Sequence, residues 1–307
     1  MEKAAKTKTR EILAKVREVE IRTRRLVDEA MAGHYESVFK GRGMDFDRVR
    51  QYARGDEIRT IDWNVTARTG SPHVKVFTEE RELSMTLMID ISASSDFGSN
   101  PQTKRELAAE LASVMAFSAV RNNDKVGLIL FTDRIELYLA PSSGRRHILR
   151  LIREILFFEP EGRGTDLGAA LDFANRVQAR KSLMLLFSDF CLGGDFGHQL
   201  DALRPKLRST AQRHDLVAVG VNDHREGSLP NIGILHIEDA ETGEILAVDT
   251  GKRSVRERFA KEAAEQRAQL RATLRRNGID FLELHTGQSY LPALNHFFQS
   301  RERRLAS

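Results

Sequence analysis

Hydrophobic and polar positions follow two alternating patterns from residue 84 to the C-terminus. Short and nearly continuous apolar runs predict buried strands, at residues 85–91, 126–131, 135–139, 183–187, 216–221 and 279–284. Apolar residues at helical spacing predict helices between them, at residues 103–121, 145–157, 166–177, 196–211, 254–276 and 291–301. Strands that alternate with helices indicate an α/β fold, a doubly wound and mainly parallel sheet flanked by helices.

The N-terminal part of the chain has a different character. Apolar positions at helical spacing predict an amphipathic helix over residues 7–32, with Gly33 as its stop. Residues 40–80 are rich in turn signals and predict short strands and turns, including a strand at 73–78. We therefore divide the chain into residues 1–80, a small helix-plus-strands segment, and residues 81–307, the α/β domain. A hairpin is also expected within the second part, at 233–237 and 244–248.

Composition narrows the classes of function. The formal net charge is +4, which is too small to indicate nucleic acid as the partner. Cys191 is the sole cysteine, so no internal disulfide forms and a reducing, cytoplasmic location is expected. The charged N-terminus does not resemble a signal peptide, and no apolar run approaches the ~20 residues that span a bilayer. We therefore expect no membrane span.

Polar side chains follow two predicted strands directly. The strand at 85–91 leads into the D-x-S-x-S sequence of residues 90–94, and the strand at 183–187 leads into Ser-Asp at 188–189. Ligands of open α/β sheets bind at the carboxyl ends of strands, so these segments and the Gly-Thr at 164–165 should converge. Two carboxylates and three hydroxyls suit a hard cation. We predict one site for Mg²⁺, or for Mn²⁺ or Ca²⁺, formed by Asp90, Ser92, Ser94, Thr165 and Asp189.

This set of residues resembles the metal-ion-dependent adhesion site of von Willebrand factor A domains. The resemblance covers residues 84–305 and implies that Ser92, Ser94 and Thr165 ligate the metal. It also implies that Asp90 and Asp189 bind directly or through water. Few protein charges would leave the ion open, so that an acidic side chain of a partner protein completes its coordination.

The segment before the α/β domain carries a second resemblance. Its motifs are similar to the family called domain of unknown function fifty-eight, in Gly43-Met44-Asp45-Phe46, Arg50-Gln51-Tyr52, Gly55-Asp56-Glu57-Ile58-Arg59, Ile61-Asp62-Trp63 and Ala67-Arg68. That family pairs such a segment with a von Willebrand A-like domain, and its genes commonly neighbour those of MoxR-type AAA+ ATPases. Many members have N-terminal membrane helices, whereas this chain resembles the short soluble branch. The resemblance implies a MoxR-type ATPase as partner.

Charged and aromatic residues are interleaved in this segment, and two interpretations stay open. The residues form either a network that docks the segment onto the sheet or a partner-binding surface. They are Arg50, Tyr52, Arg54, Asp56, Arg59, Asp62, Trp63 and Arg68. Because the interleaved acids cancel the field of the arginines, a nucleic-acid contact is the weaker interpretation.

Two alternatives compete with a binding module. Asp90 at a strand end could serve a Mg²⁺-dependent phosphotransferase or hydrolase, but the second acid of a D-x-D pair is replaced by Ser92. A nucleic-acid-binding scaffold is the other alternative. The glycines at 162–168 lack the dinucleotide spacing, since Leu167 stands where glycine is needed, and no Walker lysine motif occurs.

We therefore assign no catalytic residue. We expect a non-enzymatic, chaperone-like protein-binding module that depends on one divalent cation. By family resemblance, it would work with a MoxR-type AAA+ ATPase in the assembly or maturation of a client protein, or in the insertion of metal into it.

Overall fold

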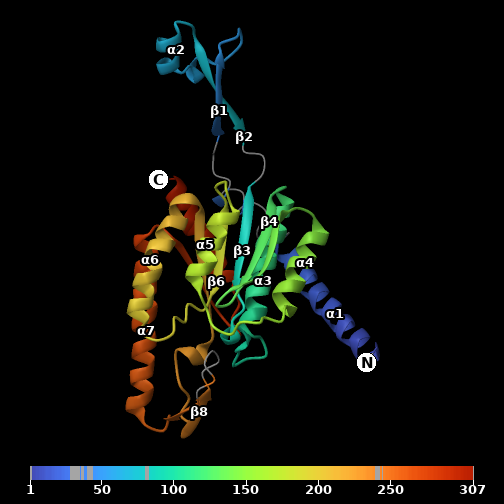
Figure 1. Ribbon diagram of the computed structural model, residues 1–307, viewed down its shortest axis with the longest axis vertical. Coiled ribbons are helices and arrows are strands. Elements are labelled where there is room, and N and C mark those ends of the chain that lie inside the picture. The colour runs from blue at the N-terminus through green and yellow to red at the C-terminus, as the bar shows by residue number, and fades with distance from the viewer. Residues whose placement is uncertain are drawn as a thin grey trace.

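The computed structural model describes residues 2–27, 35, 38–39, 44–79, 83–238, 243 and 245–306. In this part of the chain, six strands form a central sheet (Figure 1). Their order across the sheet is β10 (Asp280–His285), β7 (Asp215–Asn222), β6 (Leu183–Ser188), β3 (Ser84–Asp90), β4 (Lys125–Phe131) and β5 (Ile135–Ser142). Only the last pair, β4 with β5, is antiparallel within this sheet. The predicted mainly parallel sheet is confirmed.

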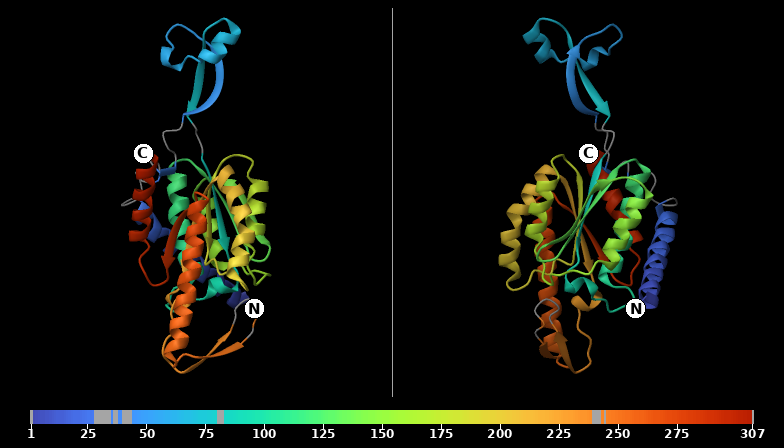
Figure 2. Two further views of the ribbon diagram at one scale, coloured as in Figure 1. Left: turned by 90° about the vertical axis from the view of Figure 1, so that its left-hand side faces the viewer. Right: turned by 45° about the vertical axis from the view of Figure 1, so that its right-hand side comes forward.

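Helices cover both faces of the sheet, as Figure 2 shows. One face packs on α3 (Lys104–Arg121), α4 (Arg145–Phe157) and α8 (Leu291–Ala306). The opposite face packs on α5 (Leu167–Val177), α6 (Phe196–Arg213) and α7 (Arg253–Arg276). Within β3, Leu87 and Ile89 pack in the first apolar cluster, between the sheet and α3, α4 and α8. Met88 packs in the second apolar cluster, on the opposite face. Burial on both sides explains why these strands read as continuous apolar runs, and the doubly wound prediction is confirmed.

The helix α1 (Glu2–Leu26) forms an outer layer on α3 and α4. Val16 and Val19 are buried in the first apolar cluster. Its polar side is paired as well, because Arg145 Nε donates to Glu20 Oε1 over 2.6 Å and Arg22 lies 2.9 Å from Glu110. The predicted helix began later, and its expected end near Gly33 lies outside the described residues.

The segment between α1 and the sheet is a two-stranded ribbon with a short helix. β1 (Met44–Gln51) pairs antiparallel with β2 (His73–Glu79), and α2 (Trp63–Thr69) lies between them. The sequence analysis expected no helix here. Its boundaries nevertheless carry ordinary signals: Asp62 accepts hydrogen bonds from the first turn, and Gly70 ends the helix with φ 72°. In Figure 1 this segment stands clear of the sheet, at the end where β3 begins.

A second hairpin connects β7 to α7. It consists of β8 (Ile234–Glu238) and β9 (Ile245–Asp249), as predicted, while most of its turn lies outside the described residues. The proposed division at residue 80 also falls among residues that are not described, and it stays a prediction. Across the described residues, no helix combines the length and apolar content needed to cross a bilayer.

Candidate cation site

The candidate site lies where the winding of the sheet reverses. β3 and β6 are neighbours, but from β3 the chain continues to β4 on one side, and from β6 it continues to β7 on the other. Because Ile89 is in register with Phe187, Asp90 and Ser188 end their strands at the same level. A crevice at the carboxyl ends of two such strands is the usual ligand position in open α/β sheets.

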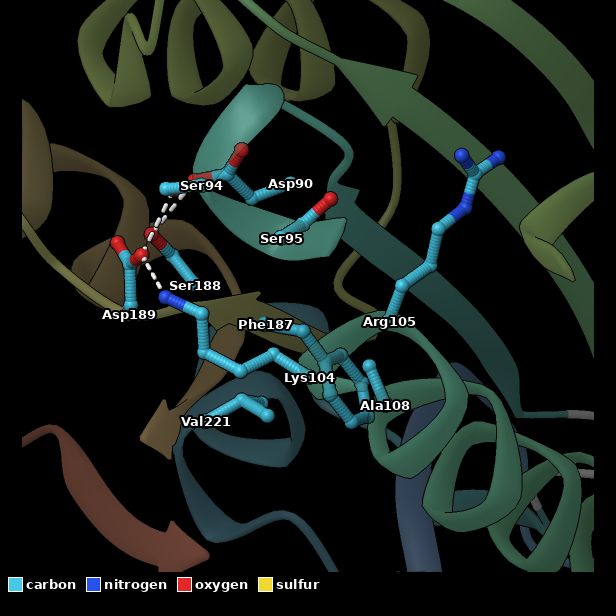
Figure 3. Close-up of a pocket in the computed structure, with 10 residues that line it drawn as sticks. All are labelled: Asp90, Ser94, Ser95, Lys104, Arg105, Ala108, Phe187, Ser188, Asp189 and Val221. Carbon is cyan, nitrogen blue, oxygen red and sulfur yellow. Dashed lines mark hydrogen bonds and ion pairs between the residues drawn. The ribbon is translucent and has the colours of Figure 1, made fainter. Parts of the chain in front are cut away.

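The side chains of the D-x-S-x-S sequence lie together because the chain turns after Asp90, and not because an extended strand places alternate residues on one side. The strand ends at Asp90, whose Oδ1 accepts a 3.0 Å hydrogen bond from the Ser92 amide, and the 3-10 helix η4 (Ala93–Asp96) follows. The Ser92 and Ser94 hydroxyls are 3.2 Å apart, and Ser94 Oγ donates to Asp189 Oδ2 over 2.8 Å (Figure 3). Four of the five predicted residues are therefore joined in one hydrogen-bonded chain.

Thr165 reaches the same place from the loop before α5. Its hydroxyl lies 3.5 Å from Asp90 Oδ2. The loop is fixed on both sides of Thr165, because the Ala93 amide donates to the Arg163 carbonyl over 3.0 Å and the Asp166 amide donates to the Thr132 carbonyl over 2.9 Å. The structure thus brings all five predicted side chains together.

Ser188 also belongs to the site, although it was not predicted as a functional residue. Its hydroxyl donates to Asp90 Oδ2 over 2.7 Å from the end of β6. Burial, together with the nearby charge of Asp189, raises the pKa of Asp90 to about 6. The signal that could have found Ser188 is its position, since a hydroxyl at a strand end beside a second carboxylate-bearing strand faces the same crevice.

Lys104 and Glu226 are two further residues that the sequence analysis missed. Lys104 Nζ lies 2.5 Å from Asp189 Oδ2 and also contacts a Glu226 oxygen. Burial alone would raise the pKa of Asp189, but the Lys104 ammonium lowers it below the usual range. A signal was available: Lys104 is the first residue of α3, where the helix dipole disfavours a cation. A lysine at that position indicates an acidic partner.

The residues present fit a small hard cation. A cavity of about 20 Å³ beside these residues can hold about one water-sized particle; Asp90, Ser94 and Asp189 line it together with Lys104, whereas Ser92 and Thr165 lie outside its lining. Within the described residues, no point gathers three or more His, Cys, Asp or Glu side chains, so hydroxyl oxygens are needed to complete a ligand set here. An all-oxygen set with two carboxylates suits Mg²⁺ or Mn²⁺ better than zinc or copper.

The eight charged and aromatic residues of the β1–β2 segment lie elsewhere. Arg50 forms two hydrogen bonds to Asp56, over 2.7 and 2.6 Å, and this guanidinium lowers the pKa of Asp56. Asp62 caps α2, and Trp63 is 68% exposed. The remaining members are exposed as well: Tyr52, Arg54, Arg59 and Arg68. In the described part of the chain, their hydrogen bonds and ion pairs stay within the segment, which favours a surface over a docking network.

Comparisons with known proteins add the family. The family model described as "Protein of unknown function DUF58" matches residues 48–269. Proteins of Mycobacterium tuberculosis and Mycobacterium bovis, both described as uncharacterized, are 32% identical over 296 residues. The match covers 95% of this chain and 90% of each relative.

Solved structures also resemble this chain. One is an aerotolerance-related membrane protein from Bacteroides fragilis, with a TM-score of 0.44 and 17% identity, which covers 71% of this chain and 99% of that one. Another is the SpRpn10 VWA domain, with a TM-score of 0.38 and 12% identity, which covers 70% of this chain and 95% of that one. The sequence matches, which span most of the chain, decide the classification. The chain belongs to the DUF58 family.

Proposed function

We propose that this chain is a protein-binding module that depends on one divalent cation, held by Asp90, Ser92, Ser94, Thr165 and Asp189. The observation that carries the proposal is the convergence of these five oxygen-bearing side chains at the β3–β6 crevice. When bound, a divalent cation offers a coordination position to an acidic side chain of a partner. The three hydroxyls and two carboxylates of this chain would hold the ion and leave that position free.

The surroundings of Asp90 support binding rather than chemistry on a substrate. Its Oδ1 accepts from the Ser92 amide, and its Oδ2 accepts from Ser188 and lies within reach of Thr165. A carboxylate nucleophile needs an acid or base beside it. The groups that hydrogen-bond Asp90 are the Ser92 amide and the hydroxyls of Ser188 and Thr165, and none of them is an acid or base at neutral pH, which supports a non-enzymatic role over a phosphotransferase or hydrolase.

Family resemblance supplies the proposed partner, a MoxR-type AAA+ ATPase, and the proposed context, the assembly or maturation of a client protein. A second contact surface would lie on the β1–β2 segment, around Trp63 and Tyr52. Exposed aromatic side chains beside arginines are typical of residues that dominate binding energy in interfaces. The basic members of this surface, Arg54, Arg59 and Arg68, favour an acidic patch on the partner.

Titration calorimetry with Mg²⁺ and Mn²⁺ tests the cation. Asp90→Asn should abolish or greatly reduce the binding heat, because it removes one of two carboxylate charges, while the exposed Asp201→Asn on α6 should bind as wild type does. Equal heats for wild type and Asp90→Asn, or none in either, would contradict the site.

Capture of a MoxR-type AAA+ ATPase, the partner that the family resemblance implies, tests the partnership. Wild-type chain should retain it in Mg²⁺ and lose it in EDTA, and Asp90→Asn should fail to retain it in both buffers. Capture that ignores EDTA would show that the interaction does not run through the cation.

A further inference from the structure

Lys104 places a positive charge on a carboxylate of the cation site. Its Nζ lies 2.5 Å from Asp189 Oδ2, and Asp189 Oδ2 is also the oxygen that accepts from Ser94. The side chains of Lys104 and Asp189 are only 2% and 4% exposed. Figure 3 shows the lysine stem running from α3 to the site past Phe187 and Val221. The ammonium is thus an internal part of the site.

The neighbouring Arg105 shows that this placement is specific to one position. Arg105 lines the same cavity but points away from Asp189 (Figure 3). Its guanidinium donates to the carbonyls of Ile155 and Phe158, both over 2.5 Å. Of these two adjacent cations, therefore, Lys104 alone contacts the acidic residues of the site.

Glu226 gives the ammonium a second acceptor. It contacts Lys104 Nζ through Oε1, while its Oε2 accepts a 2.8 Å hydrogen bond from the Asp223 amide. Glu226 therefore stays in place whether or not Lys104 also contacts Asp189. An ammonium that gives up Asp189 would keep a partly buried carboxylate partner, which lowers the cost of the exchange.

The charges of this group balance with a divalent ion bound. Asp90, Asp189 and Glu226 carry three negative charges when ionised, and Lys104 carries one positive charge. A divalent cation would neutralise the remainder. An ammonium and a cation on the same carboxylate repel each other strongly at such distances in a buried site, so both cannot hold Asp189 Oδ2 equally well.

We propose that Lys104 stands in for the divalent cation at Asp189 and competes with it, moving to Glu226 alone when the ion binds. This inference rests on the proposed cation site and adds its regulation. The ammonium keeps Asp189 paired and in position between binding events. It also sets the cation affinity lower than the five oxygen ligands would give by themselves, so that the site empties and fills with the cation concentration.

Mg²⁺ calorimetry on the full chain tests the competition, because two substitutions should change the Mg²⁺ affinity in opposite directions. Lys104→Met keeps the packed stem without the charge, and it should bind Mg²⁺ about tenfold more tightly or better. Glu226→Gln removes the alternative partner of the ammonium, and it should bind at least about threefold more weakly. Lys75→Met, which breaks a 3.7 Å ion pair with Asp62 in the β1–β2 segment, should match wild type. Equal or weaker binding by Lys104→Met would overturn the proposal.

Thermal unfolding supplies a second readout. Relative to wild type, the Tm of Lys104→Met should fall further in EDTA than in saturating Mg²⁺, since the ion replaces the missing ammonium. Equal losses in both buffers would overturn the competition. If the variant folds only with Mg²⁺, the proposal is supported. If it folds in neither buffer, Glu226→Gln decides, and affinity equal to wild type or tighter overturns it.

These outcomes separate the inference from the proposed function. If wild type binds Mg²⁺ and Lys104→Met binds it with the same affinity, the inference is overturned but the cation site is supported. Binding by Lys104→Met alone supports the inference and shows that wild type uses its lysine instead of a cation. The absence of Mg²⁺ binding in wild type and in every variant overturns both.

Discussion

The hydroxyl of Thr165 lies 3.5 Å from Oδ2 of Asp90, although 75 positions separate these residues in the chain. Asp90 ends β3, whereas Thr165 lies in the loop before α5, on the far side of β4, β5 and α4 in sequence. The contact exists because the loop between α4 and α5 is held against the strand ends by backbone hydrogen bonds from Ala93 to Arg163 and from Asp166 to Thr132. Any substitution that shifts this loop should therefore act on the cation site.

The two serines of the D-x-S-x-S turn offer a matched comparison with a third serine. Ser92→Ala removes a hydroxyl that is hydrogen-bonded to Ser94, and we expect about a tenfold loss of Mg²⁺ affinity, since one neutral oxygen contact is lost. Ser95→Ala should change the affinity by less than about twofold, because the Ser95 hydroxyl points away from Asp189 in Figure 3. Calorimetry on both variants measures the difference, and wild-type affinity of Ser92→Ala would place Ser92 outside the ligand set.

Gly162 holds the Thr165 loop close to the sheet. A Cβ at this position would lie 2.1 Å from Asp133 Oδ1 and 2.2 Å from Thr132 Oγ1. Gly162→Ala must therefore displace the loop or the side chains of Thr132 and Asp133, and it should lower the free energy of unfolding by about 1–3 kcal/mol and weaken Mg²⁺ binding.

Gly193→Ala is the control for this substitution, since a Cβ there meets nothing within 4 Å. Urea unfolding and Mg²⁺ titration of both variants provide the measurements. If Gly162→Ala keeps wild-type stability and affinity, the loop is not constrained by the close approach at Gly162.

Trp63 should contribute to partner binding without contributing to cation binding. It is 68% exposed on α2, so Trp63→Ala leaves the core intact. We expect a loss of about tenfold or more in affinity for the ATPase, as for a tryptophan in an interface centre, with an unchanged Mg²⁺ titration.

Ile245→Ala, at an equally exposed apolar residue of β9, serves as the control for Trp63. Surface plasmon resonance with immobilised ATPase compares the two variants. Equal affinity of Trp63→Ala and wild type would remove the β1–β2 segment from the interface.

Asp223 should make stability depend on pH. It accepts hydrogen bonds from the Ser99 amide over 2.9 Å and from the Ser99 hydroxyl over 2.6 Å, and it also accepts one from Thr286. Burial alone would raise the pKa of Asp223, but these hydrogen bonds lower it to about 2. Because the folded pKa lies below the usual 3.8, the stabilisation is complete above pH 4 and is lost as the pH falls toward 2.

Asp223→Asn should therefore cost about 2 kcal/mol of unfolding free energy at pH 7 and much less at pH 2.5. Urea midpoints of wild type and variant at both pH values measure this. A difference that stays constant with pH would show that the ionised form of Asp223 is not what stabilises the fold.

Hydrophobic patterning predicted the sheet and its flanking helices because burial on two faces leaves a strong periodic signal. It missed α2, whose seven residues bury no side chain and thus carry no such period; only the flanking Asp62 and Gly70 mark it. The five candidate ligands were predictable, since four of them end or follow a predicted strand and Thr165 precedes a predicted helix. Lys104 carried only the indirect signal of a cation at a helix N-terminus, and its pairing with Asp189 and Glu226 was not predictable, because that contact depends on how α3 and the loop after β7 approach each other.

β3 has a role beyond its place in the sheet. Its first residue, Ser84, follows closely on the end of β2, and its last, Asp90, belongs to the cation site. Seven residues of extended chain separate the two points by about 20 Å. β3 therefore places the candidate cation site a full strand length away from the end of the sheet that follows the β1–β2 segment. One partner that uses both proposed surfaces has to extend along at least this length, so substitutions at the two surfaces should weaken its binding independently.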